Sequence, residues 1–344
     1  MENLNIIAGP CSAETEEQVI ETARALSNNG IKIFRAGIWK PRTKPGHFEG
    51  HGEKALPWME RVKKETGMLL ATEVATPLHV EAALRGGIDI LWIGARTTVN
   101  PFAVQDIADA LRGVNTTVLV KNPINPDVEL WSGAIERIQR AGITKLGMIH
   151  RGFSAYNEKK YRYQPMWQIP IEMRRRMPEL PMYCDPSHMG GSRDLIKPLI
   201  EDALMLGFDG LMIECHRSPN DAWSDAMQQI TPSTLFDILN TLSQKRDTEE
   251  TECIGALRSR IDEIDNKLLE ILSKRMEICR EIGRYKKEQG MKVLHTGRYN
   301  NIVETHESQS DIMGVDKQCI KNVFEELHKE SIRQQMKIIR GDDN

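Results

Sequence analysis

The chain has 344 residues, of which 40% are hydrophobic and 28% charged, and its formal net charge is -3. This composition is typical of a globular protein with one large and one small domain, and the absence of a basic block argues against nucleic-acid binding. No stretch approaches the roughly 18 consecutive apolar residues of a membrane span and the N-terminus does not resemble a signal peptide, so we expect a cytoplasmic protein without a membrane partner.

Eight short apolar runs alternate with helix-like segments over residues 1–242. They are rich in Val, Ile, Leu and Met without clean alternation, as strands buried on both faces should be. Eight strand-helix units in about 240 residues predict an α/β fold, the (β/α)8 TIM barrel. The alternative is an open doubly wound sheet, which the lack of Gly-x-Gly-x-x-Gly after the first run disfavours. The expected strands are 4–9, 31–36, 68–74, 88–93, 116–121, 144–149, 181–185 and 209–214.

The expected ends of strands two to six are strongly charged. A (β/α)8 barrel places its chemistry at the carboxyl ends of its strands. Cations gathered there in a slightly acidic protein predict a site for more than one phosphate or carboxylate, unless these side chains only flank the strands in solvent. The charged residues at these ends are Arg35, Lys40, Arg42, Glu73, Arg96, Lys121 and Arg151.

The first, seventh and eighth strands end in potential metal ligands. A lone free cysteine is more often a small buried residue, but a closed barrel makes these three ends neighbours. One thiolate, one imidazole and two carboxylates suit one borderline divalent ion, such as Mn, Fe, Co or Zn. The expected ligands are Cys11, His188, Glu214 and Asp225, with Asp185 and His216 as competing ligands.

Together these motifs resemble the 3-deoxy-D-arabino-heptulosonate 7-phosphate (DAHP) synthases, over residues 1 to about 240. The resemblance implies condensation of phosphoenolpyruvate with erythrose 4-phosphate. The related synthase of an eight-carbon sugar acid typically reads Lys-Ala-Asn-Arg where this chain reads Lys-Pro-Arg, which favours erythrose 4-phosphate over arabinose 5-phosphate. The matching segments are Gly9-Pro10-Cys11-Ser12, Lys40-Pro41-Arg42-Thr43, Gly94-Ala95-Arg96, Lys121, Arg151-Gly152 and Asp185-Pro186-Ser187-His188.

The resemblance also implies roles for the cations. Arg96, Lys121 and Arg151 would hold the phosphate of phosphoenolpyruvate. Arg35, helped by Lys121, would hold its carboxylate. Arg42-Thr43 would bind the phosphate of erythrose 4-phosphate.

The same resemblance implies the catalytic groups. The metal would polarise the aldehyde. Lys40 would donate a proton to the nascent alkoxide, and Glu73 would position the attacking water. His150 stands where many members carry an acidic residue.

Residues 243–252 are polar and charged, which predicts a linker. From 254 to 282, apolar residues recur every three or four positions and predict one helix of about 32 residues. Such a helix, about 50 Å long, is too long to bury its apolar stripe in a small domain, so we expect a homodimer or homotetramer. Weaker helices at about 296–308 and 314–339 complete an all-α domain over residues 253–344.

The long predicted helix carries spaced cations. Arg275 and Lys286 share a face, whereas Arg258 lies about 25 Å away along the axis. An antiparallel partner chain would bring its own Arg258 to that site, unless these are solvated cations on a coiled-coil flank. Residues 254 to 338 resemble the all-helical chorismate mutases. The matching residues are Leu257-Arg258, Ile261-Asp262, Asp265, Leu268-Leu269, Arg275, Gly283, Lys286 and Arg298.

This second resemblance implies rearrangement of chorismate to prephenate without a metal or other cofactor. Two departures, His295 for the usual Asp and Tyr299 for the usual Glu, leave an alternative: a weakly active or inactive module for oligomerisation and feedback that binds chorismate or prephenate. We expect prephenate as the feedback ligand. A metal-dependent aldolase acting on another phosphosugar is disfavoured by the Lys-Pro-Arg-Thr segment. The implied chorismate-binding residues are Arg258 from the partner chain, Arg275, Lys286, Arg298, Ser331 and Gln335.

Overall fold

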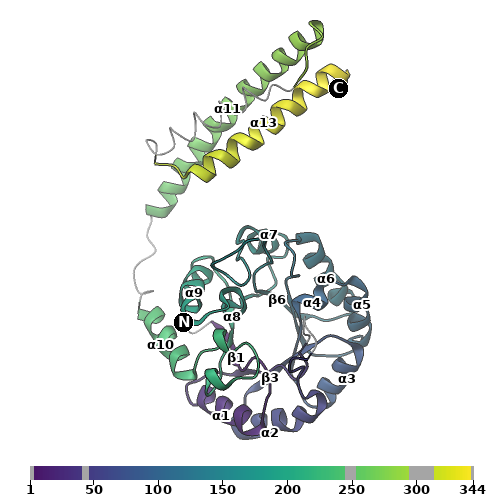
Figure 1. Ribbon diagram of the computed structural model, residues 1–344, viewed down its shortest axis with the longest axis vertical. Helices are drawn as coiled ribbons and strands as arrows, with labels where there is room; N and C mark the ends of the chain where they lie inside the picture. The colour runs from purple at the N-terminus through teal and green to yellow at the C-terminus, as the bar shows by residue number, and fades with distance from the viewer. Residues whose placement is uncertain (1–3, 41–45, 245–252, 294–313, 342–344) are drawn as a thin grey trace. The chain divides into compact units, whose positions relative to one another are not determined.

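The computed structural model describes residues 4–40, 46–244, 253–293 and 314–341. The chain divides into two compact units, residues 1–247 and 248–344 (Figure 1). Within the described ranges, no helix is both long and apolar enough to cross a membrane.

The first unit is a closed barrel of eight parallel strands in the order of the sequence. Strand β1 pairs with both β2 and β8, which closes the sheet. The predicted (β/α)8 fold is confirmed, and each expected strand lies within two residues of its observed bounds. The strands are β1 (Asn5–Gly9), β2 (Ile33–Arg35), β3 (Leu69–Val74), β4 (Ile90–Ile93), β5 (Thr117–Lys121), β6 (Lys145–His150), β7 (Met182–Cys184) and β8 (Gly210–Glu214).

Helices form a ring around the strands in Figure 1. Several begin at a side-chain cap: Thr15, Thr76, Asn100 and Asp127 each accept a hydrogen bond from a first-turn N–H. The longer helices are α1 (Glu16–Ser27), α2 (Leu56–Thr66), α3 (Pro77–Arg85), α5 (Pro101–Ala110), α6 (Val128–Arg140), α7 (Gln168–Arg176), α9 (Ile196–Met205) and α10 (Pro232–Gln244). The short ones are η1 (Gly52–Ala55), α4 (Ala95–Thr98), α8 (Pro186–Gly190), η2 (Arg193–Leu195), η3 (Pro219–Asp221) and η4 (Ala226–Gln228).

The barrel interior holds an apolar layer below the candidate site. Ile7 of β1, Leu119 of β5 and Met212 of β8 belong to this layer. Successive residues of a strand point to opposite faces, so the next inward-facing position lies two residues further on. That position is Lys121 on β5 and Glu214 on β8. Strand alternation therefore carries charged side chains to the carboxyl end of the barrel.

The turn after β1 depends on a glycine. Gly9 has a φ of 151°, and a Cβ there would lie 2.0 Å from the main-chain oxygen of Arg35. Only a residue without a side chain lets β1 approach the end of β2 this closely. The Gly9-Pro10 turn thus delivers Cys11 to the mouth of the barrel.

The second unit contains two long helices, α11 (Cys253–Glu288) and α13 (Lys317–Arg340). They pack against each other, and a Cβ on Gly283 would lie 3.2 Å from the Cα of Gln335. The predicted long helix and the last predicted helix are confirmed. The helix expected at about 296–308 lies outside the described residues.

Candidate active sites

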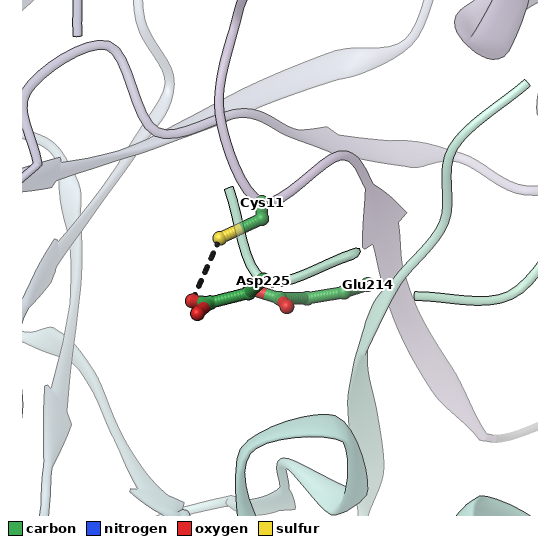
Figure 2. A group of neighbouring side chains, drawn as sticks. All are labelled: Cys11, Glu214 and Asp225. Atoms are coloured by element: carbon green, nitrogen blue, oxygen red, sulfur yellow. Dashed lines mark hydrogen bonds between the residues drawn. The ribbon is translucent and has the colours of Figure 1, made fainter. Parts of the chain in front are cut away.

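Three expected metal ligands meet at the mouth of the barrel. One ligand atom from each of Cys11, Glu214 and Asp225 lies within 4.8 Å of the others. Figure 2 shows the three neighbouring side chains. The Cys11 thiol donates a hydrogen bond to Asp225 Oδ2 at 3.2 Å, and the Cys11 main-chain N–H donates to Gln229 Oε1 at 3.0 Å. Glu214 is fully buried at the end of β8. A thiol and two carboxylates are thus fixed from three segments of the chain.

The fourth expected ligand, His188, stands beside this cluster. Its Nε2 lies 3.7 Å from Glu214 Oε1, and its Nδ1 lies 2.8 Å from Asp185 Oδ2. A carboxylate behind one ring nitrogen, with the other nitrogen turned to a metal, is the usual arrangement of a ligating histidine. Asp185 also accepts a hydrogen bond from Lys121 Nζ at 2.7 Å, so it orients other groups.

His216, the other competing ligand, faces a different carboxylate. Its Nε2 lies 3.5 Å from Glu14 Oε2. Glu14 in turn accepts hydrogen bonds from Ser12 Oγ and from the Trp223 N–H. His216 therefore belongs to a buried network that ties the turn after β1 to the segment after β8.

Burial and charge set the protonation of the cluster. Burial, reinforced by Glu214, raises the pKa of the Cys11 thiol to about 12. Burial alone would raise the pKa of Glu214 too, but His188 and Arg35 hold it below its ordinary value. The metal-free site therefore has ionised carboxylates beside a protonated thiol, which loses its proton when it ligates a metal. A sulfur, an imidazole and two carboxylates fit a borderline divalent ion.

Buried N–H groups without partners mark an anion site next to this cluster. Arg35 pairs with Glu214 at 3.1 Å, yet its Nε and Nη1 have no hydrogen-bond acceptor among the described residues. The same two atoms of Arg151 are unpaired there, although its guanidinium lies 3.5 Å from the centre of the Tyr163 ring. Buried donors almost always have partners. These four therefore point to an anionic ligand.

Two expected catalytic residues lie on the same rim. Lys40 Nζ donates to Cys11 Sγ at 3.0 Å and to the main-chain oxygen of Cys11 at 3.1 Å. Glu73, at the end of β3, accepts from Trp92 Nε1 at 3.1 Å. Arg96 is half-buried at the start of α4. Arg42 and Thr43 lie outside the described residues.

His150 is not part of the site. Its ring packs among the side chains of Trp131, Phe153, Trp167 and Phe208, with ring centres 5.3 to 6.3 Å away. This burial lowers its pKa to about 3, so the ring is neutral.

Sequence reasoning missed two groups of the site. The first is Trp92, whose indole N–H donates to Glu73. The alternation of inward- and outward-facing residues along β4 could have placed Trp92 on the inner face of the barrel. Arg162 Nη1 donates to Asp225 Oδ1 at 3.0 Å and to Gln228 Oε1 at 2.6 Å. It lies in the long segment between β6 and α7, where no periodicity predicts its position.

The second unit brings together four of the expected chorismate-binding residues. Arg275 Nη1 donates to Ser331 Oγ at 2.6 Å, and Lys286 Nζ donates to Gln335 Oε1 at 3.0 Å. Both pairs connect α11 to α13. Arg258 is exposed, 17 positions before Arg275, or about 25 Å along the helix. Arg298, His295 and Tyr299 lie outside the described part of the chain.

Comparison with known proteins connects both units to enzyme families. Residues 2–251 match the DAHP synthetase I family, and residues 257–336 match chorismate mutase type II. A phospho-2-dehydro-3-deoxyheptonate aldolase of Thermotoga maritima is 35% identical over 244 residues, which cover 70% of this chain and 68% of the relative. A 2-dehydro-3-deoxyphosphooctonate aldolase of Protochlamydia amoebophila is 29% identical over 249 residues, 65% of this chain and 85% of the relative.

Solved structures agree with the sequence matches. The crystal structure of DAHP synthase from Thermotoga maritima aligns with a TM-score of 0.64 and 32% identity, covering 71% of this chain and 69% of that one. A truncated form of the enzyme from the same organism aligns with a TM-score of 0.60 and 30% identity, covering 71% and 87%. The chain belongs to the DAHP synthetase I family, and a chorismate mutase type II domain follows its barrel.

Proposed function

We propose that the barrel joins phosphoenolpyruvate to erythrose 4-phosphate and that the helical unit converts chorismate to prephenate. The proposal for the barrel rests on the unpaired N–H groups of Arg35 and Arg151. They lie beside a cluster of sulfur, imidazole and carboxylate groups. Phosphoenolpyruvate is a compact dianion or trianion, and two buried guanidinium groups offer it the charge and the donors that water would otherwise supply.

The cations would orient phosphoenolpyruvate. Arg35 would receive the carboxylate with its two free donors, and Lys121 lies near enough to share it because both cations face the Trp92 ring. Arg151 and Arg96 would take the phosphate. Holding both ends of the substrate aims its enol carbon at the aldehyde and removes the entropy cost of finding that geometry during reaction.

The proton-transfer groups lie on the metal side of the rim. A divalent ion, Mn, Fe, Co or Zn, held by Cys11, His188, Glu214 and Asp225 would act as a Lewis acid toward the aldehyde. Lys40, whose Nζ is 3.0 Å from Cys11 Sγ, is placed to protonate the oxygen of that aldehyde as the carbon-carbon bond forms. Glu73 would orient the water that adds before phosphate leaves.

A substrate comparison tests this proposal, because the chain resembles aldolases of both the seven-carbon and eight-carbon products. The purified protein would be supplied with phosphoenolpyruvate, a divalent metal and either erythrose 4-phosphate or arabinose 5-phosphate. Loss of phosphoenolpyruvate and release of phosphate would both be followed. We expect a much higher kcat/KM with erythrose 4-phosphate. A preference for arabinose 5-phosphate, or no reaction with either sugar, would refute the proposal.

The helical unit would act by fixed positive charge. Arg275 and Lys286 hold their donors in place through Ser331 and Gln335. The rearrangement separates charge at the ether oxygen, so preorganised cations accelerate it without a covalent step. Tyr299 favours the second candidate, a feedback module that binds chorismate without turnover. A chorismate consumption assay separates the two, since the feedback module would leave chorismate unconsumed.

A second copy of the chain is the proposed partner of the helical unit. Ile261, Ile264, Leu268, Leu269 and Ile271 of α11 are each between 52% and 64% exposed. A run of exposed large apolar side chains on one helix is a typical self-association surface. We propose a homodimer through α11, or a homotetramer that contains this dimer. Light scattering of the purified chain gives the stoichiometry, and a monomer at micromolar concentration would refute it.

A further inference from the structure

We propose that Trp92 is a positioning residue for the barrel reaction: its ring face holds two substrate-binding cations, and its indole N–H holds the carboxylate that positions water. This inference rests on the function proposed for the barrel. It assigns a role to a buried apolar side chain that composition and charge do not single out.

Strand register places Trp92 between the groups it would serve. On β3 and β4, Glu73 pairs directly with Trp92, and on β4 and β5, Trp92 pairs with Leu119. Lys121 follows Leu119 by two residues, so it points to the same face of the sheet. On the other side, Arg35 of β2 pairs with Ala71, two residues before Glu73. The strands β2, β3 and β5 thus direct inward-facing residues toward the indole of β4.

The ring face contacts both cations. The Arg35 Cζ lies 4.9 Å and the Lys121 Nζ 5.8 Å from the centre of the Trp92 ring. Trp92 is only 1% exposed, and both cations are buried beside it. A cation over an indole face gains most when water is excluded, and tryptophan is the most effective ring. The indole therefore offsets part of the repulsion between two like charges that must together bind one carboxylate.

The indole edge fixes the carboxylate. Trp92 Nε1 donates to Glu73 Oε2 at 3.1 Å. On the other side, a Cβ on Gly94 would lie 2.1 Å from Glu73 Oε1, so the carboxylate packs where a side chain would otherwise be. An indole N–H can only donate, so this bond holds one oxygen of the Glu73 carboxylate in place. Glu73 is therefore held in one orientation.

Two substitutions separate the two roles. Trp92→Phe keeps an aromatic face and removes the N–H, so it should lower kcat about tenfold and leave KM for phosphoenolpyruvate within about twofold. Trp92→Gln keeps an N–H donor and removes the ring. It should raise that KM about tenfold.

Trp131→Phe is the matched control. Trp131 is fully buried, and its Nε1 donates to the main-chain oxygen of Val120 at 3.2 Å, outside the charged rim. This control should lower thermal stability, as should the Trp92 variants, and leave both kcat and KM for phosphoenolpyruvate close to the wild-type values. Equal kinetic losses in the Trp92 and Trp131 variants would reduce Trp92 to a packing residue and overturn the inference.

Equilibrium binding separates this inference from the proposed function. Phosphoenolpyruvate alone should change the intrinsic fluorescence of the wild type and of Trp131→Phe, and this change should be lost in Trp92→Phe. If the wild type makes no DAHP, the proposed function fails, while the fluorescence result still shows whether Trp92 adjoins the bound anion. If Trp92→Phe does not fold, the KM effect of Trp92→Gln decides the role of the ring. An undiminished fluorescence change in Trp92→Phe, or an unaltered KM in Trp92→Gln, would overturn the inference.

Discussion

Arg162 connects the two carboxylates of the candidate metal centre. Its Nη1 donates to Asp225 Oδ1 and to Gln228 Oε1, and Gln228 Nε2 donates to Glu214 Oε2 at 2.7 Å. One guanidinium thus sets the orientation of both carboxylates, although it is itself a cation near the place where another cation binds. Whether it helps or hinders metal binding depends on whether orientation or charge repulsion is the larger effect.

We expect orientation to be the larger effect. Arg162→Gln should weaken Mn²⁺ and Co²⁺ binding about 10- to 100-fold, the usual cost of removing a group that orients metal ligands. Metal titration gives the dissociation constants, and the visible spectrum of bound Co²⁺ reports the change in geometry. Lys160→Gln is the control, because it removes one positive charge from the same segment and Lys160 lies over the Tyr161 ring. Tighter metal binding in Arg162→Gln would mean that charge repulsion dominates.

His150 makes the barrel sensitive to acid. Burial lowers its pKa from 6.5 to about 3. Between these values the unfolded chain binds a proton that the folded barrel does not, so the free energy of unfolding falls as the pH falls below 6.5. One such proton corresponds to about 1.4 kcal/mol per pH unit. Above pH 6.5 the residue has no effect on this dependence.

The variant His150→Phe should remove this contribution. Phenylalanine suits the aromatic surroundings and takes up no proton, so the stability of the variant should fall less steeply between pH 6 and pH 4. Urea unfolding followed by tryptophan fluorescence reports on the barrel alone, because all six tryptophans lie between residues 39 and 223. Parallel stability curves for the variant and the wild type would show that His150 is not the group responsible.

At the scale of elements, the strands were predictable and their contacts were not. Runs such as Ile90–Ile93 are apolar because both faces of a barrel strand are covered, and this signal can be read from the run itself without knowing which strands lie beside it. Charged residues at the ends of such runs predicted that Arg35, Lys121 and Glu214 lie at the carboxyl ends of their strands, where the structure has them. The sequence could not place Arg162, because a loop residue meets Asp225 only after the barrel has closed.

The length of α11 separates two arginines that we expect to bind chorismate. Arg275 contacts α13 within one chain, whereas Arg258 lies about 25 Å away and exposed. If each site uses the partner's Arg258, the variants Arg258→Ala and Arg275→Ala should each lose chorismate mutase activity. The two inactive proteins would then be mixed, mildly denatured and refolded together. The mixture should recover part of the chorismate mutase activity, because a heterodimer contains one intact site.

The mixing experiment needs two controls, one for the specificity of Arg258 and one for heterodimer formation. Arg260→Ala, two positions from Arg258 and also exposed, should keep its activity. Size measurements with a tagged subunit should show that heterodimers form. Mixtures that remain inactive although heterodimers are present would place both arginines in the site of one chain, or exclude Arg258 from it.

In the whole molecule, one chain joins the DAHP synthase barrel to a chorismate mutase type II domain. We expect prephenate to inhibit the barrel reaction. A ligand shifts an equilibrium only by its different affinities for two arrangements, with a typical coupling of about 1–3 kcal/mol, or 5- to 150-fold. By reciprocity, phosphoenolpyruvate should change the affinity for prephenate by the same factor.

Synthase rates against prephenate concentration test this expectation. The full chain should be inhibited, and the full-length Arg275→Ala variant should resist inhibition because its helical site has lost a contact. Inhibition of the variant at the same prephenate concentration as the parent would place the regulatory site elsewhere. Indifference of the parent to saturating prephenate would exclude this feedback.

We propose that one chain holds a metal-dependent synthase and a metal-independent mutase. Both activities of one preparation should therefore be assayed with and without a chelator. We predict that chelation, like Cys11→Ala, abolishes DAHP formation and leaves chorismate rearrangement unchanged, and that added Mn²⁺ restores the chelated wild type. The control Cys184→Ala, which removes another fully buried thiol, should keep both activities. DAHP formation that survives complete metal removal, or loss of both activities together, would show that the metal does not serve the synthase alone.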